Sequence, residues 1–117
     1  MGRPRISGVT ELTNKIILAF AEGGVVRRNA YWFQPDIAIR IIQQAQETRT
    51  AIFGFYAATI GRYDVYESLE NSWNYVAALS PVQSPHEHAI QFISERRESG
   101  LRFAINLSEH MGGVLRA

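Results

Sequence analysis

The sequence predicts an α+β (or α/β) fold, in which three helices pack on a small mixed sheet of about four strands. Three patterns indicate this class. Apolar residues recur at helical spacing in three segments, residues 50–60 form a short and almost continuously apolar run, and residues 101–107 alternate between apolar and polar. Helices and strands that alternate in this way form a layered domain. With 117 residues, 46% hydrophobic and 20% charged, residues 1–117 are expected to fold as a single domain.

The first predicted helix covers residues 9–22. Its apolar residues are three or four positions apart and share one face: Val9, Leu12, Ile16, Ile17, Phe20 and Ala21. Ser7 or Thr10 is expected to cap its start, and Gly23 is expected to end it. The preceding residues 1–6 are expected to form a flexible N-terminal arm.

The second helix is predicted over residues 35–47, after a short strand or extended connection in residues 25–33. Pro35 suits the first helical position, and the charge of Asp36 suits the positive end of the helix dipole. The residues expected on the buried face are Ile37, Ala38, Ile41, Ile42 and Ala45.

Residues 50–60 are predicted to form a central strand that is covered on both faces, because the run is short and apolar throughout. Gly54, in its interior, indicates a bulge or a close approach by another backbone. Gly61 allows a turn, after which residues 63–66 are expected to pair as a second strand.

The third helix has the clearest start signal. Ser84, Pro85 and Glu87 form a capping box with proline at the first helical position. Gly100 is expected to end this helix, after a last turn that holds the two arginines at residues 96–97. The residues expected to face the core are Ala89, Ile90 and Ile93.

The final predicted strand covers residues 101–107 and should be half-buried, because its apolar residues alternate with polar ones. Its inward residues are expected to be Leu101, Phe103, Ile105 and Leu107. Residues 108–117 are expected to form a C-terminal tail.

The segment from Gly61 to residue 75 is the strongest candidate for a binding site. It combines aromatic side chains with three carboxylates and one arginine, so its local charge is −2 in a chain of net charge +1. Aromatic residues are enriched at interface hot spots, and carboxylates among them complement a basic partner. The predicted partner-binding residues are Tyr63, Asp64, Tyr66, Glu67, Glu70, Trp73 and Tyr75. The alternative is a solvated hairpin or loop whose aromatic side chains turn inward.

No pattern in the sequence indicates a reaction. The chain has no cysteine, and its histidines are His86, His88 and His110, of which the first two are too close in sequence to share a helix face. Asp64, Glu67 and Glu70 would line up as acids or metal ligands only in a helix. No phosphate-binding loop or nucleophile motif is present. We therefore expect a protein that is not an enzyme and has no metal or cofactor.

The apolar runs and the net charge indicate where the protein is located and whether it binds nucleic acid. No apolar run is long enough for a signal peptide or a membrane span, so a cytoplasmic protein without membrane contact is expected. The net charge of +1 does not indicate direct nucleic-acid binding. A small nucleic-acid-binding regulator stays open as an alternative, because of the GRPR sequence at residues 2–5 and the pair Arg27 and Arg28.

From residue 35 to residue 107 the chain resembles a known family. A helix with AIRIIQQAQE leads into the strand IFGFYAATIG, then YDVY, an acidic stretch and ENSW, and a helix with SPHEHAIQFI leads into RFAINL. The order is similar to that of the small cytosolic immunity proteins of bacterial polymorphic-toxin and contact-dependent growth-inhibition (CDI) systems, most closely the immunity protein forty family. The matching residues are Gly54 or Gly61, Asp64, Val65, Tyr66, Asn71, Trp73, Ala89 and Ile93.

The resemblance implies an antidote that binds one cognate toxin domain, often a nuclease, and blocks its active site or substrate path. Nuclease inhibitors usually present an acidic face, whereas this chain has a net charge of +1. The acidic surface is then local, around residues 64–70, or the toxin is not strongly basic. A phage-type inhibitor or adaptor that acts by occupying a surface is a further alternative.

Overall fold

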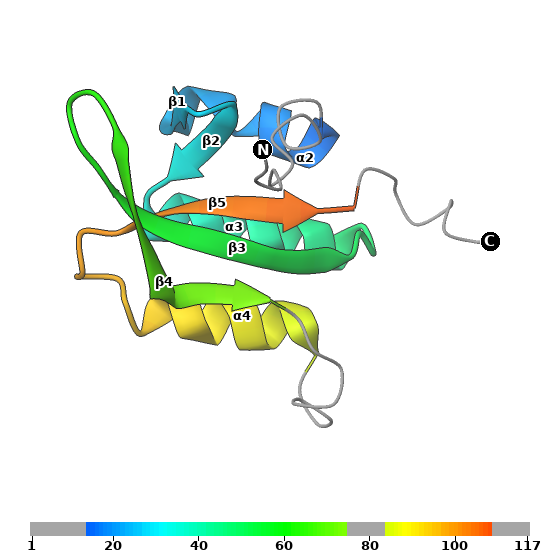
Figure 1. Ribbon diagram of the computed structural model, residues 1–117. Coiled ribbons are helices and arrows are strands. Elements are labelled where there is room, and N and C mark those ends of the chain that lie inside the picture. The colour runs from blue at the N-terminus through cyan, green and yellow to red at the C-terminus, as the bar shows by residue number, and fades with distance from the viewer. Residues whose placement is uncertain (1–13, 75–83, 109–117) are drawn as a thin grey trace.

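The computed structural model describes residues 14–74 and 84–108. Within them, five strands form one sheet in the order β1-β2-β5-β3-β4, and every pairing is antiparallel. The strands are β1 (Gly24–Arg27), β2 (Ala30–Phe33), β3 (Ile52–Ile60), β4 (Val65–Asn74) and β5 (Arg102–Leu107). The helices are α2 (Lys15–Ala19), α3 (Pro35–Glu47) and α4 (Pro85–Ser94), with the 3₁₀ turn η1 (Ala21–Gly23). The three helices lie on one face of the sheet (Figure 1). The α+β class is confirmed, with five antiparallel strands where about four in a mixed sheet were expected.

The first helix is shorter in the described residues than predicted. The Asn14 side chain caps α2 by accepting the N–H groups of Ile16 at 2.9 Å and Ile17 at 3.1 Å. The chain then tightens: the Phe20 N–H donates to the Ile17 carbonyl at 3.0 Å, and η1 replaces the predicted last turn. The proposed caps and the apolar residues before Asn14 lie outside the described residues.

Residues 24–33 form a hairpin instead of the short strand or extended connection that we predicted for residues 25–33. Arg28 and Asn29 connect β1 to β2 and have φ angles of 54° and 61°. Two consecutive positive φ values define a type I′ turn, whose twist matches that of the flanking strands. The turn escaped prediction because it contains no glycine, and arginine rarely adopts positive φ.

The second helix begins and ends as predicted, at Pro35 and Glu47. It ends in a Schellman motif: Arg49 has a φ of 60°, and the Thr50 N–H donates to the Ala45 carbonyl at 2.8 Å. The buried residues are Ala38, Ile39, Ile41, Ile42 and Ala45. Ile39 thus replaces the predicted Ile37, which is only partly buried, because α3 is covered by α4 as well as by the sheet.

The predicted central strand is confirmed, since β3 lies between β5 and β4. The close approach predicted at Gly54 is also confirmed: a Cβ there would lie 2.3 Å from the Trp73 carbonyl oxygen. β5 differs from prediction. It is buried on both faces, because Ala104 faces a second apolar cluster on the side away from the helices.

Ser108, where we placed the start of the tail, is buried against the fold. Its N–H donates to the Ala51 carbonyl at 2.9 Å, and its carbonyl accepts from Asn14 Nδ2 at 2.8 Å. Residues 109–117 lie outside the described part of the chain.

The third helix is capped as predicted, because the Ser84 hydroxyl accepts the Glu87 N–H at 3.0 Å. The helix ends at Ser94 and is followed by turns as far as Gly100, which has a φ of 83°. The two arginines at residues 96–97 therefore follow the helix instead of lying in its last turn.

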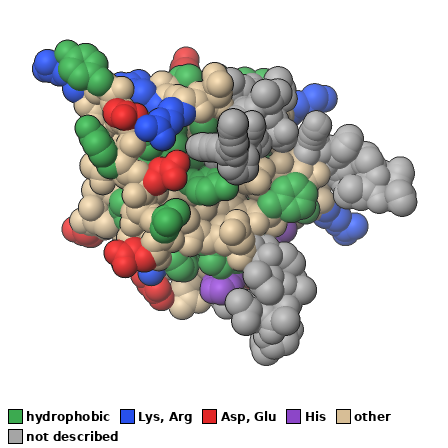
Figure 2. Space-filling model, in the orientation of Figure 1, with side chains coloured by type: hydrophobic (Ala, Val, Ile, Leu, Met, Phe, Trp, Pro, Cys, Tyr) green, Lys and Arg blue, Asp and Glu red, His purple; other side chains and the backbone are tan. Residues whose placement is uncertain are grey.

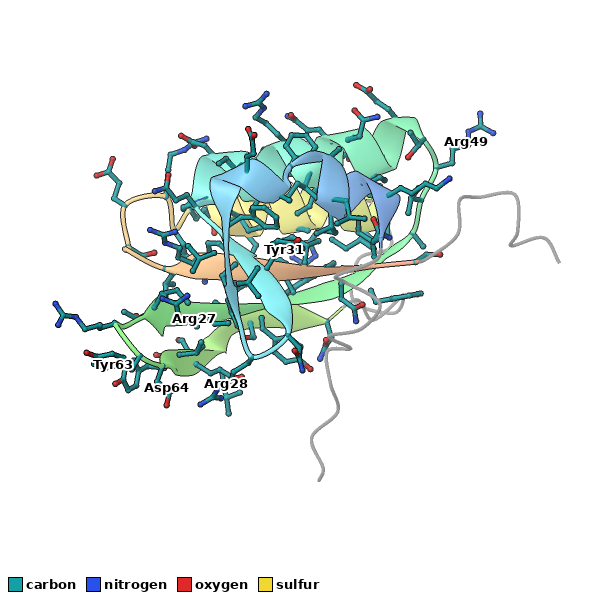
Figure 3. All side chains as sticks on the ribbon, turned by 90° about the horizontal axis from the view of Figure 1, so that it is seen from above. Arg27, Arg28, Tyr31, Arg49, Tyr63 and Asp64 are labelled. Atoms are coloured by element: carbon teal, nitrogen blue, oxygen red, sulfur yellow. The ribbon has the colours of Figure 1, made fainter. Side chains whose placement is uncertain are left out.

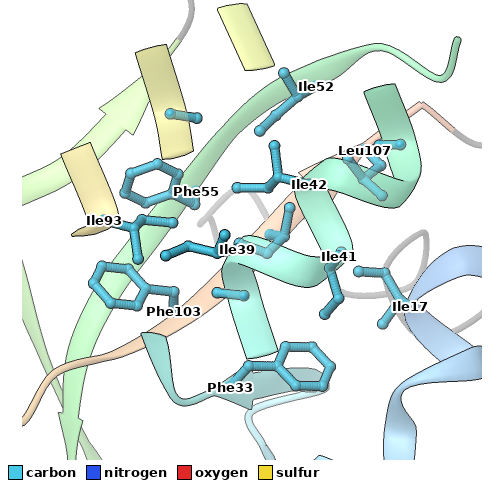
Figure 4. Packing of buried hydrophobic residues seen from close by; sticks show 14 of the residues in the cluster. Ile17, Phe33, Ile39, Ile41, Ile42, Ile52, Phe55, Ile93, Phe103 and Leu107 are labelled. Carbon is cyan, nitrogen blue, oxygen red and sulfur yellow. The ribbon is translucent and has the colours of Figure 1, made fainter. Parts of the chain in front are cut away.

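The main core lies between the helices and the sheet (Figure 4). It brings together Phe33, Ile42, Phe55, Ile93 and Phe103, all 2% exposed or less. A second cluster lies on the opposite face and consists of strand residues alone: Ala30, Trp32, Ala58, Val65 and Ala104, with Tyr56 and Ile60 partly buried against it. This cluster spans four adjacent strands, β2, β5, β3 and β4. The hairpins that contain β2 and β4 also meet directly through Arg28 and Asp64, although β5 and β3 lie between them, so the sheet curls toward its helix-free side.

Candidate functional site

The predicted binding residues lie on β4 and on the turn that precedes it. Tyr63 is 85% exposed and Tyr66 is 62% exposed, and Glu67 and Glu70 are also exposed. Leu69, which sequence reasoning missed, is 77% exposed between the two glutamates. We call Tyr63, Tyr66, Glu67, Leu69 and Glu70 the β4 surface. The sequence did contain a signal for Leu69, because it is a leucine between acidic residues in a segment that resembles a loop.

The side chains of the β4 surface flank an edge and do not share one flat face. Glu67 is paired with Ala58 of the second cluster, so its side chain lies on the helix-free side. Tyr66 is paired with Thr59 and points to the other side. Its ring lies against Gly61, where a Cβ would be 2.8 Å from Tyr66 Cε2. Gly61 therefore allows the Tyr66 ring to pack against the backbone of β3.

Asp64 joins the two hairpins of the sheet. Its Oδ1 accepts a hydrogen bond from Arg28 Nη2 at 2.7 Å and another from the Val65 N–H at 2.7 Å. Figure 3 shows Arg28 and Asp64 on the side of the sheet away from the helices. The Val65 N–H, and next the Arg28 guanidinium, hold the pKa of Asp64 below its usual value. Asp64, predicted as a charge partner for a toxin, thus already has a cation beside it.

The ion pair between Asp64 and Arg28 should make the free energy of unfolding depend on pH in the acid range. A carboxyl group whose pKa is lower in the folded than in the unfolded chain stabilises the fold above the unfolded value of about 3.9, and this contribution is lost as the pH falls through the folded value. We expect wild type to exceed Asp64→Asn in free energy of unfolding at about pH 6, and the difference to shrink below about pH 4. Urea unfolding at several pH values measures it. A difference that persists unchanged at about pH 2 would contradict the link.

Trp73, a predicted binding residue, packs against the main core. Its ring stacks on Phe55 with the ring centroids 5.6 Å apart, and His88 meets it edge-on at 5.3 Å. It is only partly buried. Tyr75 lies outside the described residues. The structure places Tyr63 and Asp64 on the turn before β4, Tyr66, Glu67 and Glu70 along β4, and Trp73 beside the core.

A wide bulge shapes the middle of β4. Phe55 pairs with Trp73 but Ala57 pairs with Ser68, so β4 has three more residues than β3 in this interval. The Ser72 hydroxyl spans the gap: it accepts the Ala57 N–H at 2.9 Å and donates to the Ser68 carbonyl at 2.9 Å. The bulge therefore replaces a direct ladder bond with a side-chain bridge.

Arg96 holds the bulge against the end of α4. Its Nε donates to Asn71 Oδ1 at 2.7 Å, and Asn71 Nδ2 donates to Ser68 Oγ at 2.9 Å. The guanidinium also lies 3.5 Å from the centre of the Phe92 ring and donates to the Phe92 carbonyl at 2.9 Å. Leu69 and Glu70 are thus displayed on a segment fixed by hydrogen bonds, which lowers the entropic cost of binding.

Removing the Ser72 bridge should destabilise the fold. Ser72→Ala leaves the N–H of the buried Ala57 without its partner, and an unsatisfied buried donor costs about 1–3 kcal/mol. Ser72→Thr is the matched control, because it keeps the hydroxyl group on a strand. Chemical denaturation of both variants measures the effect. Equal stability of the two variants would show that the bridge contributes nothing.

Acidic, basic and hydrophobic side chains are mixed over the β3–β4 hairpin, without a block of one charge (Figure 2). Salt bridges in residues 14–74 and 84–108 involve Asp64, Glu95 and Asp36, and none involves Glu67 or Glu70. The net acidic charge of the β4 surface therefore comes from these two glutamates.

The described residues also hold titratable side chains at other points of the fold. Among them, no three His, Asp or Glu side chains lie together as metal ligands would. His86 Nε2 lies 2.8 Å from the Thr50 carbonyl oxygen, where it tethers α4. A cavity of about 280 Å³ at the start of α3 is lined partly by Asp36 and Arg97, which form a salt bridge at 2.7 Å. None of the helices in residues 14–74 and 84–108 is both long and apolar enough to cross a membrane.

In comparisons with known proteins, the sequence matches no family model and has no match among curated proteins. The resemblance to the immunity protein forty family therefore stays a prediction.

Proposed function

We propose that the protein is an immunity protein: an antidote that binds a cognate bacterial toxin domain in the cytoplasm and blocks its active site or substrate path. The observation that carries the proposal is the exposure of three large side chains along β4 and the turn before it, namely Tyr63, Tyr66 and Leu69. Isolated exposed apolar residues are common, but a group rimmed by charges is typical of interaction sites. The protein acts by occupying a surface, without catalysis and without a cofactor.

The charge of the β4 surface supports a basic partner. Glu67 and Glu70 are exposed, and neither forms a salt bridge with another described residue. Asp64 already pairs with the Arg28 guanidinium. Of the three carboxylates predicted to contact the toxin, Glu67 and Glu70 therefore remain. A nuclease domain, which must attract nucleic acid, offers the complementary positive surface.

The decisive experiment uses the gene directly upstream of this one, which the proposal predicts to encode the toxin. The encoded toxin domain is produced in cells with and without this protein, survival is measured, and the purified pair is titrated by calorimetry. We expect survival and a one-to-one complex. The proposal fails if the two proteins do not bind. Binding of the purified protein to duplex DNA, with steep weakening by salt, would favour the regulator alternative.

The glutamates should act mainly on the rate of association. We expect Glu67→Gln with Glu70→Gln to slow toxin binding by about tenfold at low salt, with a smaller effect at high salt, because exposed charges steer encounter and are screened. Glu22→Gln with Glu47→Gln is the matched control: both side chains are exposed, on η1 and at the end of α3, and the pair of changes removes the same charge away from the β4 surface, so it should slow association less. Surface plasmon resonance at two salt concentrations measures both. Equal effects of the two double substitutions would contradict this assignment.

A further inference from the structure

β4 is an edge strand whose main chain is partly unpaired. It ends the order of the described strands, and among these it pairs with β3 alone. The N–H of Gly61 donates to the Asp64 carbonyl at 2.8 Å, which makes these residues a hydrogen-bonded pair. Bonded and non-bonded pairs alternate along an antiparallel ladder. Tyr66 therefore turns its main-chain groups toward β3, whereas Val65 and Glu67 turn theirs toward the open edge.

Within residues 14–74 and 84–108, one of these outward main-chain groups has a hydrogen-bond partner and the others have none. The Asp64 carboxylate accepts the Val65 N–H at 2.7 Å. In the described part of the chain, the backbone hydrogen bonds outside the ladders include none to the Glu67 N–H or carbonyl. Edge strands are commonly blocked by bulges or charges. Here the bulge begins only after Ser68, so residues 65–68 form a short open edge.

We propose that this edge binds an extended, basic segment of the partner protein, which pairs with β4 as an added antiparallel strand. The residue opposite Glu67 would share its face, with Cβ atoms about 4.5–5.5 Å apart, so lysine or arginine is favoured there. The next residue would lie beside Tyr66 on the other face, where an apolar side chain fits. The segment therefore alternates basic and apolar residues, a binding mode known as β-augmentation.

A second copy of this chain fits the edge less well. Pairing two β4 strands about Glu67 places the Glu67 carboxylates of both copies on facing positions, and Glu70 of each copy follows in the adjoining bulge. Like charges on facing strands are destabilising. Charge therefore selects a basic segment of another protein.

The inference deepens the proposed function and rests on it, but a peptide tests it separately. The probe is a seven-residue peptide in which lysine alternates with valine, titrated into the ¹⁵N-labelled protein and followed by NMR. We expect shifts at residues 65–68 and at least tenfold slower hydrogen exchange of the Glu67 amide. The same peptide with glutamate for lysine should not bind.

Methylation of the peptide nitrogens tests the pairing itself. In the proposed register the lysine N–H groups bond to β4 and the valine N–H groups face away, so N-methylation of the lysines should abolish binding and N-methylation of the valines should not. Glu67→Lys should weaken binding about tenfold or more, and the matched change Glu22→Lys, on the exposed η1 turn, should not.

Several results would overturn the inference: no binding of the basic peptide, shifts at other strands, equal effects of the two methylations, or dimerisation through β4. If the toxin binds but Glu67→Lys and the peptide leave that binding unchanged, the immunity function stands and strand addition is wrong. If the peptide binds as expected but no toxin does, the edge is a peptide site and the immunity function is wrong.

Discussion

Phe55→Ala should lower the free energy of unfolding by about 3–5 kcal/mol, the range measured for truncation of a buried phenylalanine. Phe55 is 2% exposed, and its ring centroid lies 5.4 Å from that of Phe103, 5.5 Å from that of Phe92 and 5.6 Å from that of Trp73. The substitution removes apolar burial together with all three aromatic contacts, which add about 0.5–1.5 kcal/mol each. Denaturant unfolding followed by circular dichroism measures the loss.

The same strand supplies the control. Phe53 is two residues from Phe55 and is 53% exposed, so Phe53→Ala should cost less than about 1 kcal/mol. If Phe55→Ala does not fold, Phe55→Leu keeps much of the volume and should give a smaller, measurable loss of about 1.5 kcal/mol or less. Similar losses for the alanine variants of Phe53 and Phe55 would show that the buried face of β3 is assigned wrongly.

Tyr66→Ala should weaken toxin binding by about 2–4 kcal/mol, or roughly 30-fold to 1000-fold in Kd, while leaving stability almost unchanged. The ring is 62% exposed, so little burial is lost from the fold, but it is a fixed aromatic beside the acidic edge. Calorimetric titration of the toxin domain, together with thermal unfolding of the free variant, separates affinity from stability.

Trp73→Ala provides the contrast. Trp73 was predicted as a second anchor, but its ring packs on Phe55 and the main core. We expect this substitution to lower stability first. Phe53→Ala, which removes an exposed aromatic away from the β4 surface, should change neither quantity much. An unchanged affinity in Tyr66→Ala would remove that residue from the interface, and an affinity loss in Trp73→Ala without loss of stability would restore Trp73 to it.

Local signals were sufficient where one segment determines its own structure. Pro35 and the apolar stripe after it predicted α3 with its bounds, because helical spacing and a fixed φ act within one or two turns. Ser84 predicted the start of α4 because a cap needs only the next three residues. Gly54 predicted a close backbone approach because only glycine leaves room for the Trp73 carbonyl. The acidic and aromatic composition around residue 66 was equally visible.

Contacts between distant segments decided the rest. The curl of the sheet pairs Arg28 with Asp64, 36 residues apart, and buries Ala104 on a face that alternation alone assigned to solvent. The Ser72 bridge and Arg96 turn an apparent loop into a bulged edge strand. On this bulged strand, Trp73 packs on the core, whereas Tyr66 and Leu69 stay exposed. The sequence by itself determined that acidic and aromatic side chains are concentrated in residues 63–75. The tertiary structure decided which of them reach the surface, because burial and charge pairing depend on partners that the local sequence does not contain.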